Sequence, residues 1–263
     1  MTTTDTIERI KELLTLFKLP TMAAECVRRL RDAGHDDALP VVVEVLEAEL
    51  GERRVRRCDR LLRASKLPPG KTFETLDEKR LPKAITPRLR ELATADFLER
   101  AANVLCFGLP GTGKTHAACA LGHALVQQGH AVLFTPTFQL VQELLAAKRD
   151  LELPRALRKL DAFEVIILDD LGYVQQSAEE VEVLFTLMAE RYERRSMVIT
   201  SNLVFGEWDR IFKNPMTTMA AIDRMVHHAI ILEMAGPSIR EEEAKAARRG
   251  SDPRSAASPE ATA

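Results

Sequence analysis

Several common signals are missing from this 263-residue chain. Its four cysteines form no C-x-x-C pair, and its six histidines show no metal-ligand spacing, which argues against a disulfide or zinc framework. The cysteines are Cys26, Cys58, Cys106 and Cys119, of which the last two lie in apolar surroundings and are expected to be small core residues. The formal net charge is only −2, so local basic clusters must carry any contact with nucleic acid.

Signals for export or membrane insertion are missing as well. The first residues, Met1–Asp5, have neither the basic flank nor the apolar core of a signal peptide. No apolar stretch is long enough to cross a bilayer. The sequence therefore predicts a cytoplasmic protein with reduced thiols and no membrane partner.

The first part of the chain, residues 1–68, contains no strand signal. Apolar residues at helical spacing predict three helices, over about residues 6–17, 22–33 and 41–66. Asp5 is the expected N-cap of the first helix, and Pro68-Pro69-Gly70 ends the pattern. We expect a small all-helical N-terminal domain that serves DNA binding or oligomerisation.

Beyond Phe73, strands alternate with helices. The predicted strands are Val104–Phe107, Ala131–Thr135, Val165–Leu168, Met197–Thr200 and Ala229–Leu232. The predicted helices are 86–101, 114–128, 138–148, 154–160, 179–194 and a stretch through Met225. This alternation predicts an α/β domain over residues 69–250, with a parallel sheet covered by helices on both faces. The Ser-, Pro- and Ala-rich tail, residues 251–263, is predicted to be disordered.

One octet carries the strongest chemical signal. Strand Val104–Phe107 leads directly into a G-x-x-x-x-G-K-T loop, and a helix follows, which is the context of a phosphate-binding P-loop. Its glycines let backbone N–H groups approach a phosphate, and the N-terminus of the helix adds its positive end. Lys114 is expected to reach the β- and γ-phosphates, and Thr115 to ligate Mg²⁺. The predicted nucleotide-binding residues are Gly108, Leu109, Pro110, Gly111, Thr112, Gly113, Lys114, Thr115 and His116.

Two acidic residues, Asp169 and Asp170, follow the apolar strand Val165–Leu168. One carboxylate is expected to hold Mg²⁺ opposite Thr115, and the other to polarise the attacking water as a general base. We favour Asp169 for the metal and Asp170 for the base, although residue chemistry alone leaves this division open. The alternative is that the pair only caps the next helix.

Three further polar residues are candidates for the same site. Asn202 follows the strand Met197–Thr200, where an amide reaches the γ-phosphate or orients water, although Ser-Asn is also ordinary turn chemistry. Arg224 and Arg240 are candidates for neutralising charge on the γ-phosphate, which a neighbouring subunit can also do. For Arg224 the alternative is a surface ion pair with Asp223 or Glu190. The predicted catalytic residues are Lys114, Asp170, Asn202, Arg224 and Arg240.

The motifs together resemble the AAA+ ATPases, and within them the DnaC/IstB group of helicase loaders and insertion-sequence helper ATPases. The resemblance extends over nearly the whole chain and rests on Gly108–Thr115, Leu168–Gly172, Ile199–Asn202, Asp223-Arg224 and Ser238–Arg240. It implies Walker A and Walker B at the first two segments, sensor 1 at Asn202, an arginine finger at Arg224 and sensor 2 at Arg240. It also implies ATP, rather than another nucleotide, together with Mg²⁺.

Two features depart from the AAA+ pattern. Many members have Asp-Glu in Walker B, whereas this chain has Asp169-Asp170, and the shorter base predicts slow hydrolysis that DNA or a partner stimulates. The sequence also ends soon after Arg240, which leaves no room for a full helical lid. Assembly is therefore expected to use other surfaces, including the N-terminal domain.

Two basic clusters are candidate DNA contacts that would neutralise phosphates without reading sequence. One cluster lies on a single face of the third predicted helix: Arg53, Arg56, Arg57 and Arg60. Acidic residues one turn earlier are the alternative partners of these arginines, across subunits. The other lies between the second strand and Walker B, where the resemblance implies an inserted helix: Lys148, Arg149, Arg155, Arg158 and Lys159.

The resemblance implies an ATPase that assembles on double-stranded DNA as an ATP- and DNA-dependent homo-oligomer and recruits or activates a transposase. A DnaC-like helicase loader is the alternative, because the two groups share the ATPase core. A metabolic kinase or GTPase fits poorly, since no N-K-x-D guanine motif is present.

Overall fold

The computed structural model describes residues 2–172, 177–203, 207, 225–227, 229–236 and 238. The chain forms two compact units, Met1–Arg60 and Leu61–Ala263. Each unit has its own apolar core, and each is described separately below.

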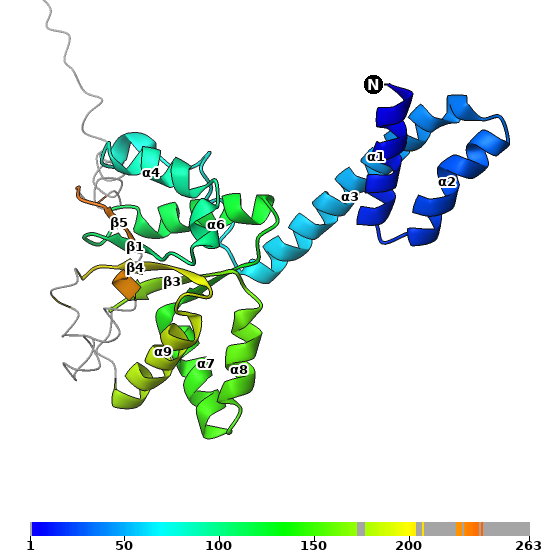
Figure 1. Ribbon diagram of the computed structural model, residues 1–263. Helices are drawn as coiled ribbons and strands as arrows, with labels where there is room; N and C mark the ends of the chain where they lie inside the picture. The colour runs from blue at the N-terminus through cyan, green and yellow to red at the C-terminus, as the bar shows by residue number, and fades with distance from the viewer. Residues whose placement is uncertain are drawn as a thin grey trace, which may run out of the picture. The chain divides into compact units, whose positions relative to one another are not determined.

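In the first unit, the regular elements among the described residues are all helices. It contains α1 (Thr3–Leu16), α2 (Pro20–Asp32), the short 3₁₀ helix η1 (Asp36–Ala38) and most of α3 (Leu39–Ser65) (Figure 1). Its core is small and joins residues from the three α-helices: Ile10, Leu14, Val27 and Leu39.

The predicted N-cap of the first helix is wrong. Thr2 is the N-cap of α1, and Asp5 is the third residue of the helix. The Thr2 hydroxyl accepts a hydrogen bond from Asp5 N at 3.2 Å, and the Asp5 carboxylate accepts one from Thr2 N at 2.9 Å. This reciprocal capping box satisfies two N–H groups that the helix itself leaves unpaired.

The second unit contains a five-stranded parallel sheet in the order β2-β3-β4-β1-β5. The strands are β1 (Val104–Phe107), β2 (Val132–Pro136), β3 (Val165–Leu171), β4 (Ser196–Ser201) and β5 (Ile230–Glu233). The first four strands in chain order are almost continuously buried, as expected for a sheet covered on both faces.

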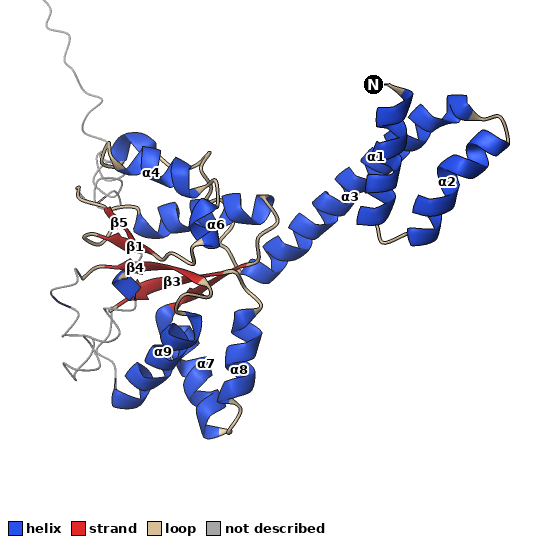
Figure 2. Ribbon diagram, viewed as in Figure 1, coloured by secondary structure: helices blue, strands red, loops and turns tan. Residues whose placement is uncertain are grey.

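Helices cover both faces of this sheet (Figure 2). Besides the end of α3 and the 3₁₀ turn η2 (Glu78–Arg80), the helices described in this unit are α4 (Ile85–Leu92), α5 (Asp96–Glu99), α6 (Lys114–Gln127), α7 (Thr137–Arg149), α8 (Leu153–Asp161) and α9 (Ala178–Arg191). Successive strand residues point to opposite layers: Val104 and Cys106 join the core under α4 and α6, whereas Leu105 and Phe107 join the core under α7 and α9. The predicted α/β architecture is confirmed.

Two predicted boundaries differ from the structure. The helix expected over 86–101 is two helices, because the chain turns at Ala95, which has a positive φ of 72°. β3 extends three residues past Leu168 and so includes both acidic residues, Asp169 and Asp170. The helical stretch expected before Met225 lies outside the described residues.

The buried cysteines behave as packing residues. Burial raises the pKa of the Cys106 and Cys119 thiols to about 12, so both are neutral at physiological pH. In the described part of the chain, no group of three or more His, Cys, Asp or Glu side chains is placed to hold a metal ion.

Candidate nucleotide-binding site

The loop between β1 and α6 takes a conformation that requires glycine. Gly108, Gly111 and Gly113 have positive φ angles of 152°, 81° and 92°. A Cβ atom on Gly108 would lie 2.3 Å from the backbone oxygen of Met234, just beyond β5. Glycine is therefore required at position 108 for two reasons: its positive φ and the close approach of the Met234 backbone.

Lys114 points into this loop. Its side chain is buried, and Nζ donates hydrogen bonds to the backbone oxygens of Gly108 at 2.7 Å and Leu109 at 2.8 Å. Thr112 also donates to Leu109 O, at 2.9 Å. The ammonium group is thus held inside the turn of the loop, where an anionic phosphate group can take over contacts from the carbonyl oxygens.

Asp169 lies where three elements meet. Its Oδ1 accepts hydrogen bonds from the hydroxyl of Thr115, at the start of α6, at 2.9 Å and from the hydroxyl of Thr200, on β4, at 2.7 Å. The backbone oxygen of Asp169 accepts a third bond, from Thr137 Oγ1 at 2.9 Å. Only 8% of Asp169 is exposed, so the two hydroxyl bonds to Oδ1 compensate for burying its charge.

Asp170 differs from Asp169 in exposure and backbone. Its side chain is exposed, its φ is +57°, and its backbone N–H donates to Thr200 Oγ1 at 2.9 Å. The positive φ turns the chain so that the two adjacent carboxylates occupy different surroundings. The carboxylate of Asp169 is therefore buried and that of Asp170 exposed, a difference that the sequence alone did not predict.

The predicted position of Asn202 follows from the strand register. Asn202 comes directly after β4, and Ser201 Oγ donates to Leu171 O, at the end of β3, at 2.8 Å. Since the strands are parallel, their carboxyl ends lie at the same edge, so Asn202 and Asp170 share that edge with the P-loop. Asn202 is half-buried there.

His116 connects the start of α6 to the segment that precedes α4. Its Nε2 lies 3.2 Å from Thr72 O and 3.1 Å from Thr75 Oγ1. These contacts hold residues 72–75 beside the P-loop helix. Arg224 and Arg240 lie outside the described residues.

Sequence reasoning missed Thr200 and Thr137. Thr200 both donates to Asp169 and accepts from Asp170, so it uses its hydroxyl hydrogen and one lone pair on the two acidic residues. The only sequence signal was a hydroxyl at the end of an apolar strand, and a β-branched threonine is common in strands for packing reasons.

The two predicted DNA clusters are partly engaged in intrachain ion pairs. Arg53 and Arg56 both contact Glu49, at 2.6 and 3.3 Å, and Arg53 lies 4.2 Å from the centre of the Phe17 ring. The hydrogen bond from Arg53 lowers the pKa of the Glu49 carboxyl below its ordinary value. The arginine face is therefore partly neutralised within its own helix.

The second cluster is also divided. Lys148 pairs with Glu182 at 2.6 Å, and Arg155 pairs with Glu152 at 3.3 Å. Within the described part of the chain, the other three cations of the cluster are exposed and form no ion pair: Arg149, Arg158 and Lys159.

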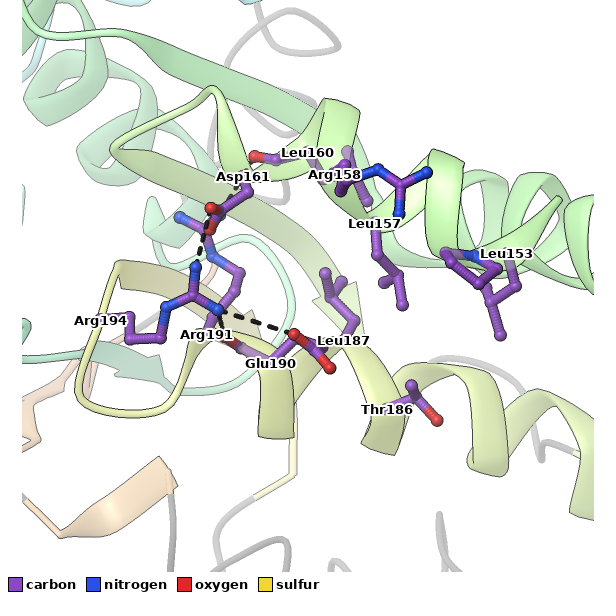
Figure 3. A pocket seen from close by; sticks show the side chains of 11 residues that line it. Leu153, Leu157, Arg158, Leu160, Asp161, Thr186, Leu187, Glu190, Arg191 and Arg194 are labelled. Carbon is purple, nitrogen blue, oxygen red and sulfur yellow. Dashed lines mark hydrogen bonds and ion pairs between the residues drawn. The ribbon is translucent and has the colours of Figure 1, made fainter.

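Arg158 also borders a groove between α8 and α9, with a volume of about 430 Å³ (Figure 3). Leucines from both helices line it, and charged residues stand around them: Leu153, Leu157, Leu187, Arg158, Glu190 and Arg194. None of its lining residues belongs to the P-loop or to the acidic pair, so the groove is separate from the nucleotide site.

The parallel sheet and the P-loop, with an acidic strand end beside the loop, define a P-loop nucleotide-binding protein. The model of the IstB-like ATP-binding protein family matches residues 12–247. The chain belongs to this family, and its nucleotide is ATP.

Curated relatives agree with this assignment. An insertion-sequence ATP-binding protein of Sinorhizobium fredii is 43% identical over 244 residues, which cover 92% of this chain and 82% of that protein. The ATP-binding protein of insertion sequence IS5376 from Geobacillus stearothermophilus is 34% identical over 89% of this chain and 94% of that protein.

Solved structures with low sequence identity share the fold. The DnaC helicase loader is 19% identical with a TM-score of 0.52, and the match covers 67% of this chain and 99% of that chain. The replication initiator DnaA, bound to AMPPCP and single-stranded DNA, is 16% identical with a TM-score of 0.56, over 69% of this chain and 56% of that chain. Among the helices that the structure describes, none is both long and apolar enough to cross a membrane.

Proposed function

We propose that this protein is an ATPase that assembles on double-stranded DNA and recruits or activates a transposase. The observation that carries the ATPase part is the contact of Thr115 and Thr200 with one oxygen of Asp169, which joins the P-loop helix to two strand ends. The transposition part is supported by the family and by the insertion-sequence relatives.

Mg²⁺ fits this site. The Thr115 hydroxyl and the Asp169 carboxylate are hard oxygen donors 2.9 Å apart, and Mg²⁺ takes few protein ligands besides phosphate oxygens and water. Thr115 and Asp169 would therefore hold the ion, which would neutralise charge on the β- and γ-phosphates.

The protein residues would then divide the remaining work. Lys114 exchanges its contacts with Gly108 O and Leu109 O for phosphate oxygens and stabilises their charge. Asp170 accepts a proton from the attacking water, and Asn202 orients that water or the γ-phosphate. Arg224 of a neighbouring subunit and Arg240 supply the positive charge that links hydrolysis to assembly.

The short Asp170 side chain is the basis for slow turnover. Steady-state ATP hydrolysis, measured alone, with duplex DNA and with the transposase, is expected to rise with each addition. Asp170→Asn should abolish hydrolysis while leaving ATP binding intact, because Asn also accepts a positive φ. Unchanged hydrolysis in this variant would exclude Asp170 as the base.

Assembly is tested by size-exclusion chromatography with light scattering on the protein alone, with ATP, and with ATP and duplex DNA. Growth into a large complex only with both additions would support the transposition-helper function, with residues 1–68 contributing to DNA binding or oligomerisation and 69–250 acting as the ATPase. A species whose mass is the same in all three conditions would contradict it. A helicase pull-down would then test the loader function, which the DnaC-like fold favours as the second candidate.

A further inference from the structure

Asn103 is a buried polar residue directly before β1, at the edge of the sheet where the strands begin. Only 8% of it is exposed, and asparagine is uncommon in strands. The whole of β1, about 13 Å long, separates Asn103 from the P-loop at the opposite edge. Asn103 therefore does not contact a nucleotide at its own P-loop, and its burial needs another explanation.

The side chain of Asn103 uses both ends of its amide. Oδ1 accepts a hydrogen bond from Met197 N at 2.9 Å, and Nδ2 donates one to Met225 O at 3.2 Å. Met197 lies in β4 before the first residue pair that joins β4 to β1, which is Val198 with Val104. The amide oxygen of Asn103 thus takes the place of a main-chain acceptor for the buried Met197 N–H.

Asn103 also holds both ends of the turn that leads into β5. Met225 and Val226 have helical conformation, and Ile230 begins β5. Within the turn, Ala229 N donates to Val226 O at 2.9 Å. Nδ2 of Asn103 donates to Met225 O, and the backbone oxygen of Asn103 accepts from Ile230 N at 2.8 Å. One residue at the start of β1 therefore fixes the chain before and after this turn.

The chemistry of these contacts calls for asparagine. The last carbonyl groups of a helix have no partner within the helix, so Met225 O needs a donor from elsewhere. Met225 itself is 1% exposed and packs in the core under α7 and α9. A short neutral amide can accept from Met197 N and donate to Met225 O at once, whereas an ionised aspartate has no donor and a leucine has neither group.

We infer that Asn103 is a positioning residue for Arg224, which directly precedes Met225 in the sequence. This inference rests on the function proposed above, in which Arg224 serves the nucleotide of a neighbouring subunit. The bond to Met225 O fixes the backbone next to Arg224 against the start of β1, so fewer orientations of that arginine compete with the productive one. Met225 O is held at the edge opposite the P-loop, which suits an arginine that acts on another copy.

The first test compares ATP affinity with turnover in full-length Asn103→Ala. ATP affinity, measured by titration with a fluorescent nucleotide, should change by less than about twofold, because the P-loop lies at the other end of β1. Turnover with ATP and duplex DNA should fall by about tenfold or more, since catalysis is sensitive to small displacements of the groups involved. Wild-type turnover, or a fall in affinity as large as the fall in turnover, would overturn the inference.

A mixing experiment separates the positioning of Arg224 from a general structural defect. Asn103→Ala subunits keep their own ATP site, whereas Asp170→Asn subunits lack the proposed base but keep Asn103 and Arg224. In a mixed assembly on DNA, the Asp170→Asn subunits can supply Arg224 to ATP that their neighbours hold. Turnover of the mixture should therefore exceed the sum of the two proteins measured alone.

The matched control is Arg224→Ala mixed with Asp170→Asn, which tests the arginine finger itself. A gain in both mixtures would support the inference. A gain with Arg224→Ala alone would leave the proposed function standing and overturn the role of Asn103. A gain with Asn103→Ala alone would show that Asn103 acts through another residue. A gain in neither mixture would contradict the arginine finger, and the inference would fall with it.

A second variant serves if Asn103→Ala does not fold. Asn103→Asp retains the acceptor for Met197 N, and in its ionised form it lacks the donor for Met225 O. In mildly alkaline buffer it should show the same loss of turnover and the same gain on mixing with Asp170→Asn. Wild-type turnover of this variant would overturn the inference, because the bond to Met225 O would then not be needed.

Discussion

Thr200 and Asp169 are joined by a 2.7 Å hydrogen bond in which the hydroxyl donates to Oδ1, and the same hydroxyl accepts the N–H of Asp170 at 2.9 Å. One threonine therefore fixes the side chain of the first acid and the backbone of the second. Thr200 is a positioning residue for both roles that we assign to this acidic pair.

We expect Thr200→Val to lower ATP turnover by about tenfold or more while ATP affinity changes little. A hydrogen bond to a charged group contributes about 1.5–3 kcal/mol, and this bond orients the acids without touching the nucleotide. Turnover and nucleotide affinity are measured separately, by steady-state hydrolysis and by titration with a fluorescent nucleotide.

Thr200→Ser provides the control, because it retains the hydroxyl. Near-normal turnover in the Ser variant and reduced turnover in the Val variant would identify the hydrogen bond as the cause. Equal loss in both would point to packing of the methyl group, and normal turnover in both would exclude the positioning role.

Some parts of the site could be predicted from the sequence and others could not. The P-loop could be predicted because its motif residues lie in one octet, where the glycines, Lys114 and Thr115 each have a local reason to be there. Thr200 could not, because its contact with Asp169 depends on the pairing of β3 with β4, strands whose partners are about thirty residues apart along the chain. Pairing of this kind brings two ordinary strand residues together without a local motif.

The same limit applies to the fold. Apolar runs and periodicity predicted the parallel sheet and its helices, since burial on both faces leaves a strong pattern. The turn at Ala95 had no such signal, because neither glycine nor proline marks it. Asp5 was misplaced for a related reason: Thr2 and Asp5 are both good capping residues, and only the reciprocal bonds show which one is the N-cap.

We expect Gly108→Ala to abolish ATP binding and to lower the melting temperature. The new Cβ would lie 2.3 Å from Met234 O, so the loop or the end of β5 must move. Gly236→Ala is the matched control, because nothing lies within 4 Å of a Cβ at that glycine. Nucleotide titration and thermal unfolding measure both effects, and wild-type behaviour of Gly108→Ala would show that the loop accommodates a side chain.

The exposed cations around α7 and α8 provide a test of DNA contact. Replacing Arg149, Arg158 and Lys159 with Ala should weaken duplex binding in the presence of ATP. If each contacts one phosphate, the slope of log affinity against log salt should fall by about 0.9 per residue. Fluorescence anisotropy at several salt concentrations measures this slope.

The control for this prediction is Lys148→Ala with Arg155→Ala, which removes cations that already pair with Glu182 and Glu152. This double variant should change the slope less per residue. An unchanged slope in the triple variant would show that this cluster does not touch DNA.

Arg191 is expected to stabilise the second unit through backbone contacts. Arg191 is only 1% exposed, and its guanidinium donates to four carbonyl oxygens near the end of α8 and the starts of β3 and β4: those of Leu160, Phe163, Glu164 and Ser196. Burial lowers its pKa to about 10, so it remains charged at neutral pH.

Arg191→Met would remove all of these donors at once and leave buried carbonyls unpaired. Since each unpaired group costs about 1–3 kcal/mol, the free energy of unfolding should fall by about 3 kcal/mol or more. Arg194→Met is the control from the same region (Figure 3), because Arg194 is 57% exposed and its 2.9 Å ion pair with Asp161 contributes about 0–1 kcal/mol. Urea unfolding of the two variants compares these losses directly. Equal losses would mean that the carbonyl contacts of Arg191 stabilise the unit no more than a surface ion pair does.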